Sequence, residues 1–184
     1  NKTQFILMMT PVVLFSLTVH EYSHGKTAFL LGDDTAYRLG RLSFNPLRHL
    51  DPIGVLFFYF MGFGWAKPVP VDWRNFANPR KDMMFVSLAG PLSNIALAVL
   101  CSAFIRIISP YENEFLFILT SFAVYINVAL AVFNMLPLYP LDGSSILKGL
   151  VPRELAAKLV ALDRIGAFLM LGAFLLDHFL HTGI

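Results

Sequence analysis

Long apolar stretches with few charges alternate with shorter polar stretches along the chain. The apolar stretches cover residues 3–31, 52–66, 83–105, 115–141 and about 159–180. A helix needs about 20 apolar residues to cross the hydrocarbon core of a bilayer. The first, third and fourth stretches meet this length, the fifth meets it if its charged ends lie at the interfaces, and residues 52–66 fall short. The pattern predicts an all-α polytopic membrane protein with about four to five transmembrane helices and a re-entrant segment at 52–66.

Two polar stretches separate these apolar ones, at residues 32–51 and 67–82. Residues 36–44 alternate loosely between apolar and polar side chains, which is typical of a strand. Residues 64–71 contain Pro68 and Pro70, which lack an N–H group, so a strand here must lie at an edge or a bulge. The two stretches therefore predict a small β element beside the helices.

The composition supports a membrane protein. Hydrophobic residues make up 57% of the 184 residues and charged residues only 14%, against about 25% charged in a typical soluble domain. A soluble globule of this size could not cover so much apolar surface with charge. The net charge of +2 creates no strong basic field, so we expect no nucleic-acid partner.

The first apolar stretch contains the pattern HExxH, formed by His20, Glu21 and His24. On a helix, the two histidines lie one turn apart on the same face and could bind one zinc ion. Glu21 lies beside that face, where the general base for an activated water must stand. The alternative is a pair of histidines packed in a helix core. That alternative is weaker here, because an ionised side chain at the centre of a membrane helix costs about 2.5–3.5 kcal/mol unless something pairs with it.

A catalytic zinc site usually has a third protein ligand. Asp142 is the best candidate, because Pro137 and Pro140 prevent the fourth apolar stretch from continuing as a helix. Irregular backbone at membrane depth is tolerated where it is buried in protein or lines a watery cavity. The alternative is that Asp142 is an acid in an interfacial loop. Asn134, just before the two prolines, could hydrogen-bond the site or a peptide, or it could be an ordinary interhelical amide. The other candidate ligands are His49, His178, His181 and the remaining acids.

Several motifs together resemble the site-2 protease family of intramembrane zinc metalloproteases, in particular compact members that lack a PDZ domain. The motifs are HEYSH at 20–24, NMLPLYPLDG at 134–143, GWAKPVPV at 64–71, AGPLSN at 89–94 and the stretch 40–54. The resemblance covers about residues 19–147. It implies that His20, His24 and Asp142 bind one Zn²⁺ ion, that Glu21 is the catalytic base, and that Asn94 and Asn134 help to hold the substrate backbone.

On this resemblance we expect residues 1–184 to form a single membrane-embedded metalloprotease domain, with a catalytic core at about 4–147 and a C-terminal helix at about 155–181. A re-entrant second stretch would place His20 and Asp142 at a similar depth. It would also place most Lys and Arg residues on one side, which the positive-inside rule makes cytoplasmic. We therefore expect a multi-pass protein of the plasma membrane whose active site lies toward the cytoplasmic side.

The expected reaction is hydrolysis of peptide bonds in the transmembrane segments of protein substrates within the lipid bilayer. An unwound substrate could add as a strand to residues 64–71 or 36–44. One alternative is a membrane metal transporter, which would need several acids along a membrane path. The other is a protease-like scaffold that binds helices without cutting them, which would not need Glu21.

Overall fold

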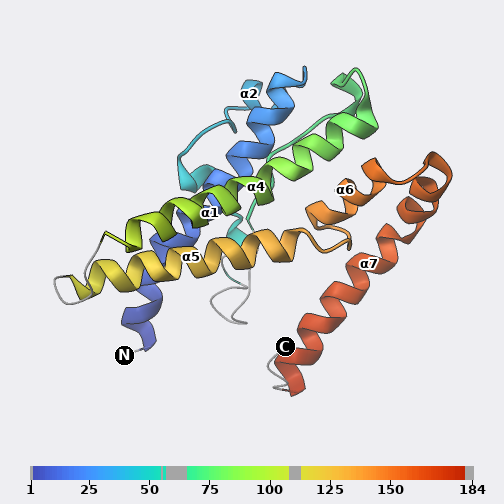
Figure 1. The fold of residues 1–184 in the computed structure, drawn as a ribbon. Helices are drawn as coiled ribbons and strands as arrows, with labels where there is room; N and C mark the ends of the chain where they lie inside the picture. The colour runs from blue at the N-terminus through green and yellow to red at the C-terminus, as the bar shows by residue number, and fades with distance from the viewer. Residues whose placement is uncertain (1, 55, 57–65, 108–112, 181–184) are drawn as a thin grey trace.

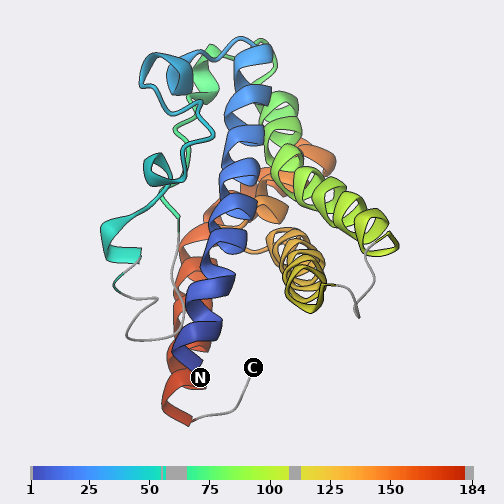
Figure 2. The same ribbon diagram turned by 90° about the vertical axis from the view of Figure 1, so that its left-hand side faces the viewer.

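Three long helices cross one another to form the centre of the molecule in a computed structural model (Figure 1). The structure describes residues 2–54, 56, 66–107 and 113–180. Helix α4 (Pro79–Ile105) packs against α1 (Lys2–Leu30), α5 (Glu114–Asn134) and α6 (Asp142–Leu150), and α1 also packs against α5. Figure 2 shows α1 and α4 side by side, with α5 crossing them. Helix α4 is therefore the element that the other central helices share.

The apolar stretches form helices close to the predicted bounds. Helix α5 ends at Asn134, where Pro137 was expected to stop it, and α7 (Arg153–Leu180) coincides with the predicted C-terminal helix. Residues 57–65, most of the stretch whose spanning or re-entrant course was in question, lie outside the described residues, so the re-entrant segment remains a prediction.

Two of the described helices, α4 and α5, are long and apolar enough to cross a membrane. Their outward faces carry large apolar side chains, including Val99 (62% exposed) and Val132 (62% exposed). Side chains of this kind are stable on the surface when lipid covers them. On length and composition, these two helices are candidate membrane spans, and the other spans expected from the sequence stay predictions.

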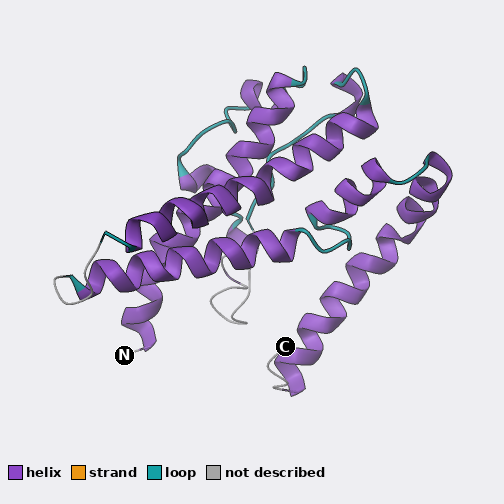
Figure 3. Cartoon of the chain, in the orientation of Figure 1, coloured by secondary structure: helices purple, strands orange, loops and turns teal. Residues whose placement is uncertain are grey.

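The predicted small β element is wrong in the described part of the chain, where Figure 3 shows helices and loops. Residues Thr35–Arg38 form the short helix α2. Just before it, Asp33 accepts hydrogen bonds from the N–H and the hydroxyl of Thr35, a local pattern that favours a turn over a strand. The only β-type pairing there is one isolated antiparallel bridge between Leu50 and Ala66. Pro68 and Pro70 follow this bridge, and their missing N–H groups prevent a longer ladder.

The polar stretches pack over the end of α1 instead. They contain two short 3₁₀ helices, η1 (Pro46–Arg48) and η2 (Trp73–Asn75). Phe44 stacks on Tyr22 of α1 with ring centroids 4.0 Å apart, and Arg41 donates hydrogen bonds to the carbonyl oxygens of Lys67 and Pro68. These contacts hold the extended segment 67–71 against the helix that carries HExxH.

Helix α7 packs against α6, and its far end stands apart from the three central helices in Figure 1. Lys148 of α6 forms an ion pair with Asp163 of α7, with Nζ and Oδ2 2.7 Å apart. Arg80 of α4 donates hydrogen bonds to the carbonyl oxygens of Lys148 and Gly149. Helix α6 is therefore held from both sides, by α4 and by α7.

Candidate metal centre

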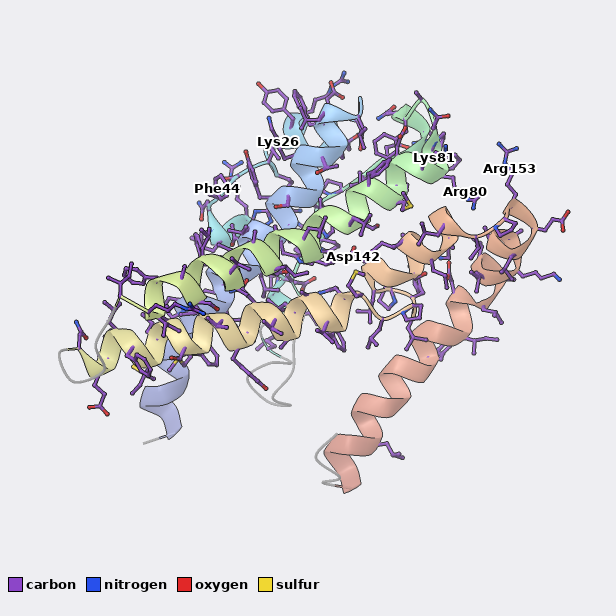
Figure 4. The ribbon with its side chains drawn as sticks, in the orientation of Figure 1. Lys26, Phe44, Arg80, Lys81, Asp142 and Arg153 are labelled. Carbon is purple, nitrogen blue, oxygen red and sulfur yellow. The ribbon has the colours of Figure 1, made fainter. Side chains whose placement is uncertain are left out.

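The structure brings together the three residues that the sequence predicted as metal ligands. The Nε2 atoms of His20 and His24 lie 3.2 and 3.3 Å from Oδ2 of Asp142, and the three ligand atoms all lie within 4.8 Å of one another. Figure 4 places Asp142 at the start of α6, beside α4. Residues more than 100 positions apart in the sequence thus meet at one point.

The hydrogen bonds of the two histidines leave both Nε2 atoms available as ligands. Nδ1 of His24 lies 2.7 Å from the carbonyl oxygen of Val86, and a carbonyl oxygen can only accept, so this nitrogen carries the proton. Nδ1 of His20 lies 2.6 Å from Oδ1 of Asn94. In a neutral imidazole with a protonated Nδ1, Nε2 presents its lone pair, and both lone pairs point toward Asp142.

The same point holds a carboxylate oxygen that no donor satisfies. Oδ2 of Asp142 is buried and receives no hydrogen bond within the described structure, which is costly unless a cation compensates it. Two imidazolium ions would bring more positive charge than one carboxylate neutralises, whereas a single divalent cation accommodates all three donors. Two imidazole nitrogens and one carboxylate oxygen are a typical ligand set for catalytic zinc. The residues therefore fit a Zn²⁺ ion.

Two glycines give the ligands the space that they occupy. A Cβ atom on Gly90 of α4 would overlap the imidazoles of His24 and His20, and a Cβ atom on Gly143 would overlap the carbonyl oxygens of Met135 and Leu136 at the end of α5. Gly90 thus lets α4 approach the histidines, and Gly143 lets the first turn of α6 fold back against α5. The close approach at Gly143 allows the neighbouring Asp142 to lie beside the two histidines.

Glu21 lies next to the ligands on α1 but outside the group that could bind a metal ion. Its Oε2 accepts a hydrogen bond of 2.8 Å from the backbone N–H of Val69. The other carboxylate oxygen keeps its acceptor capacity, so a half-buried carboxylate stands beside the candidate ligands with one oxygen anchored.

The two asparagines lie in different surroundings. Asn94 is fully buried and bonds to His20, so its side chain faces the metal centre from behind the ligand. Asn134 is half-buried at the end of α5, and its Nδ2 donates to the carbonyl oxygen of Leu130. A substrate-binding role for both stays a prediction.

Among the described residues, His49, which the sequence also offered as a ligand, does not join the group. His49 is buried, and its Nε2 lies 2.7 Å from the carbonyl oxygen of Ser43. The side chain of His178 and all of His181 lie outside the described structure.

A buried carboxylate that the sequence analysis missed fixes the end of α1. Asp33 is fully buried and accepts hydrogen bonds from the backbone N–H of Asp72 and the amide of Asn75, each of 2.8 Å, as well as from Thr35. Burial raises the pKa of this carboxyl, but the hydrogen bonds from Thr35, Asn75 and Asp72 outweigh burial, and the net pKa lies below its usual value. Asp33 thus ties α1 to the segment that leads into α4.

The sequence analysis gave no role to Gly90, which lies against the two histidines, or to Asn127, which bonds to Asn94. A glycine inside an apolar helix and an asparagine inside a charge-free stretch are both signals that a sequence shows. Neither signal identifies the partner, because the partner lies on another helix.

Taken together, a bundle of apolar helices holds two histidines and an aspartate that could bind a metal ion, beside a glutamate, an arrangement typical of metallopeptidases with an HExxH motif. The family model for peptidase family M50 matches residues 109–175. "Putative zinc metalloprotease YwhC" of Bacillus subtilis (strain 168) is 40% identical over 175 residues, which are 91% of this chain and 79% of the relative. The chain therefore belongs to peptidase family M50, the site-2 protease family of integral membrane proteins.

More distant relatives agree with this assignment. Rip2 of Mycolicibacterium smegmatis, which carries the same descriptive name, is 31% identical over 138 residues. That alignment covers 71% of this chain and 52% of Rip2, so the chain spans about half the length of this relative. MJ0611 of Methanocaldococcus jannaschii, also so named, is 43% identical over 63 residues, which are 34% of this chain and 32% of the relative. No solved structure is significantly similar to the chain.

Proposed function

We propose that this chain is an intramembrane zinc endopeptidase that hydrolyses peptide bonds in the transmembrane segments of other proteins. The observation that carries the proposal is the meeting of His20, His24 and the unsatisfied oxygen of Asp142, with Glu21 on the same helix turn. Membership of family M50 supports a membrane-protein substrate.

A zinc ion bound by these three residues would polarise a substrate carbonyl and activate a water molecule as the nucleophile. Glu21 takes the proton from the attacking water and later passes it to the leaving amine. Its anchored Oε2 leaves the other oxygen to move the proton. His20 and His24 keep their Nδ1 protons, held by Asn94 and the Val86 carbonyl, throughout the cycle.

The substrate must be extended at the site, because a transmembrane helix hides its carbonyl groups in internal hydrogen bonds. The segment 66–71 begins at the Leu50–Ala66 bridge and contacts Glu21 through the N–H of Val69. We assign it the task of holding the unwound substrate, and we assign Asn134 contact with the substrate backbone. The basic residues of the polar stretches orient the site toward the cytoplasmic side of the plasma membrane.

Replacement of the base tests the proposal. Glu21→Gln should keep the zinc content of wild type and lose cleavage of a transmembrane model substrate by about 100-fold or more. Glu154→Gln makes the same chemical change at an exposed position of α7 and should cleave as wild type does. Asp142→Asn should lose zinc as well as cleavage.

Undiminished cleavage by Glu21→Gln would refute the role of the base. Metal flux through proteoliposomes without cleavage would favour a transporter.

A further inference from the structure

Three polar side chains are buried together where α1, α4 and α5 cross. Ser16, Asn94 and Asn127 have exposed fractions of 1%, 0% and 2%. Buried polar groups between membrane helices are uncommon and must satisfy one another. Each of the three comes from a different helix, so the group joins all the central helices at one level. On α1 this level lies about one turn before His20.

The hydrogen bonds within this group run in one direction. Nδ2 of Asn127 donates to the carbonyl oxygen of Ala123 over 2.8 Å and to Oγ of Ser16 over 2.9 Å. A carbonyl oxygen only accepts, so the amide nitrogen of Asn127 must face Ala123. Consequently Oδ1 of Asn127 faces Asn94 and can act there only as an acceptor.

The orientation of the Asn127 amide fixes that of the Asn94 amide, which contacts the metal centre. Its Nδ2 donates to Oδ1 of Asn127 over 2.8 Å and to the carbonyl oxygen of Ser16 over 3.3 Å. Its Oδ1 is thereby turned toward Nδ1 of His20. A flipped Asn94 amide would face two acceptors with its oxygen, and would donate to Nδ1 of His20, which would move the imidazole proton to Nε2 and block the ligand atom.

We propose that Asn127 is a positioning residue for the metal centre, acting through Asn94 to keep the Nε2 lone pair of His20 directed at the metal ion. The inference rests on the proposed function, since it requires that the His20–His24–Asp142 centre binds zinc. Partners behind a metal ligand that fix its orientation typically change metal affinity by about 10–100-fold when they are lost. Because Asn127 acts through a second residue, we expect an effect near the lower end of this range.

The test compares metal binding among variants of the full chain purified in detergent. The probes are Zn²⁺, competed against a chromophoric chelator, and Co²⁺, followed by its visible absorption. Asn127→Ala and Asn127→Leu both remove the amide. Ser16 and Asn127 line a groove of about 420 Å³ between α1, α4 and α5, so the truncated side chain of the alanine variant adjoins open space. Both variants should bind zinc about tenfold more weakly and show an altered cobalt spectrum.

Two further variants separate positioning from helix packing. Thr120→Val changes a buried polar residue on the same helix whose hydroxyl, among the described residues, bonds to its own helix at the Leu116 carbonyl. This variant should bind both metals as wild type does. Asn127→Asp keeps an acceptor facing Asn94 and should restore most of the zinc affinity, even if the variant is less stable.

The outcomes distinguish this inference from the proposed function. Wild-type zinc affinity and an unchanged cobalt spectrum in Asn127→Ala would overturn the inference while the zinc site stands. Equal loss in Asn127→Ala and Thr120→Val would also overturn it, because general packing would then explain both. Absence of zinc binding by the wild type would instead refute the proposed function and the inference with it.

Discussion

The backbone N–H of Val69 donates a hydrogen bond of 2.8 Å to Oε2 of Glu21, 48 positions earlier in the chain. Val69 stands between Pro68 and Pro70, which have no N–H to offer. The tripeptide therefore has a single backbone N–H group, and the proposed base accepts its hydrogen bond. This bond joins the extended segment beside the site to the residue proposed to transfer a proton there.

Removal of this one donor should slow the reaction without removing the metal. Val69→Pro deletes the N–H, while Val69→Thr keeps it with a side chain of nearly equal volume. A hydrogen bond to a charged group contributes about 1.5–3 kcal/mol, and 1.4 kcal/mol corresponds to about tenfold in rate. We expect kcat to fall about tenfold or more in Val69→Pro, with wild-type zinc content. An equal fall in Val69→Thr would show that the side chain of Val69, rather than its N–H, supports Glu21.

A methyl group at Gly90 should disrupt the metal centre, because it would overlap the imidazoles of His24 and His20. Overpacking of this kind typically costs about 1–3 kcal/mol, so we expect Gly90→Ala to weaken zinc binding about tenfold or more. Gly172→Ala is the matched control, since a Cβ atom at Gly172 of α7 meets no other atom within 4 Å. Zinc affinity measured by competition should be unchanged in the control. A Gly90→Ala variant with wild-type affinity would mean that α4 does not approach the histidines this closely.

Asp33 should make the protein less stable in acid. Its pKa in the folded protein is lowered by the hydrogen bonds it accepts, so its contribution to stability is fully present above its unfolded pKa of about 3.9. That contribution is lost as the pH falls through the lower, folded pKa. Asp33→Asn should lower the unfolding temperature at pH 7, because one oxygen that accepts a hydrogen bond becomes a donor.

The difference in unfolding temperature between wild type and Asp33→Asn should shrink as the pH falls below about 4. Asp34→Asn provides the comparison, since Asp34 pairs with Arg38 on the surface and exposed pairs contribute little. Thermal unfolding in detergent at several pH values measures both. A constant difference between wild type and Asp33→Asn across the acid range would exclude this role of the Asp33 carboxylate.

The features that depend on local pattern could be predicted from the sequence. The spacing of His20 and His24 follows from the helix period, and Pro137 accounts for the end of α5 at Asn134. The strand expected at 36–44 was wrong because one local contact, the hydrogen bonds from Thr35 to Asp33, outweighs a loose alternation of apolar and polar side chains.

Features that depend on the crossing of helices could not be predicted in this way. The overlap that makes Gly90 necessary, and the placement of Asn94 behind His20, are set by how α4 crosses α1. The angle at which α4 crosses α1 cannot be derived from the sequence periodicity of α4. The sequence marks such residues as unusual for an apolar helix, and only the packed structure supplies their partners.

The ion pair between Lys148 and Asp163 should couple the stability of α7 to the metal centre. The two side chains are only 17% and 22% exposed, and Nζ lies 2.7 Å from both carboxylate oxygens. Loss of one partner from a largely buried pair leaves an uncompensated charge. Lys148→Met and Asp163→Asn should each lower the unfolding temperature, and the double variant should lose less than the sum of the two, with a coupling of about 1 kcal/mol.

Because α6 begins with Asp142 and Ser144 bonds to Asp163, each single variant should also bind zinc more weakly than wild type. Additive losses in the double variant would show that the pair does not act as a unit, and unchanged zinc affinity would show that α7 can loosen without moving Asp142.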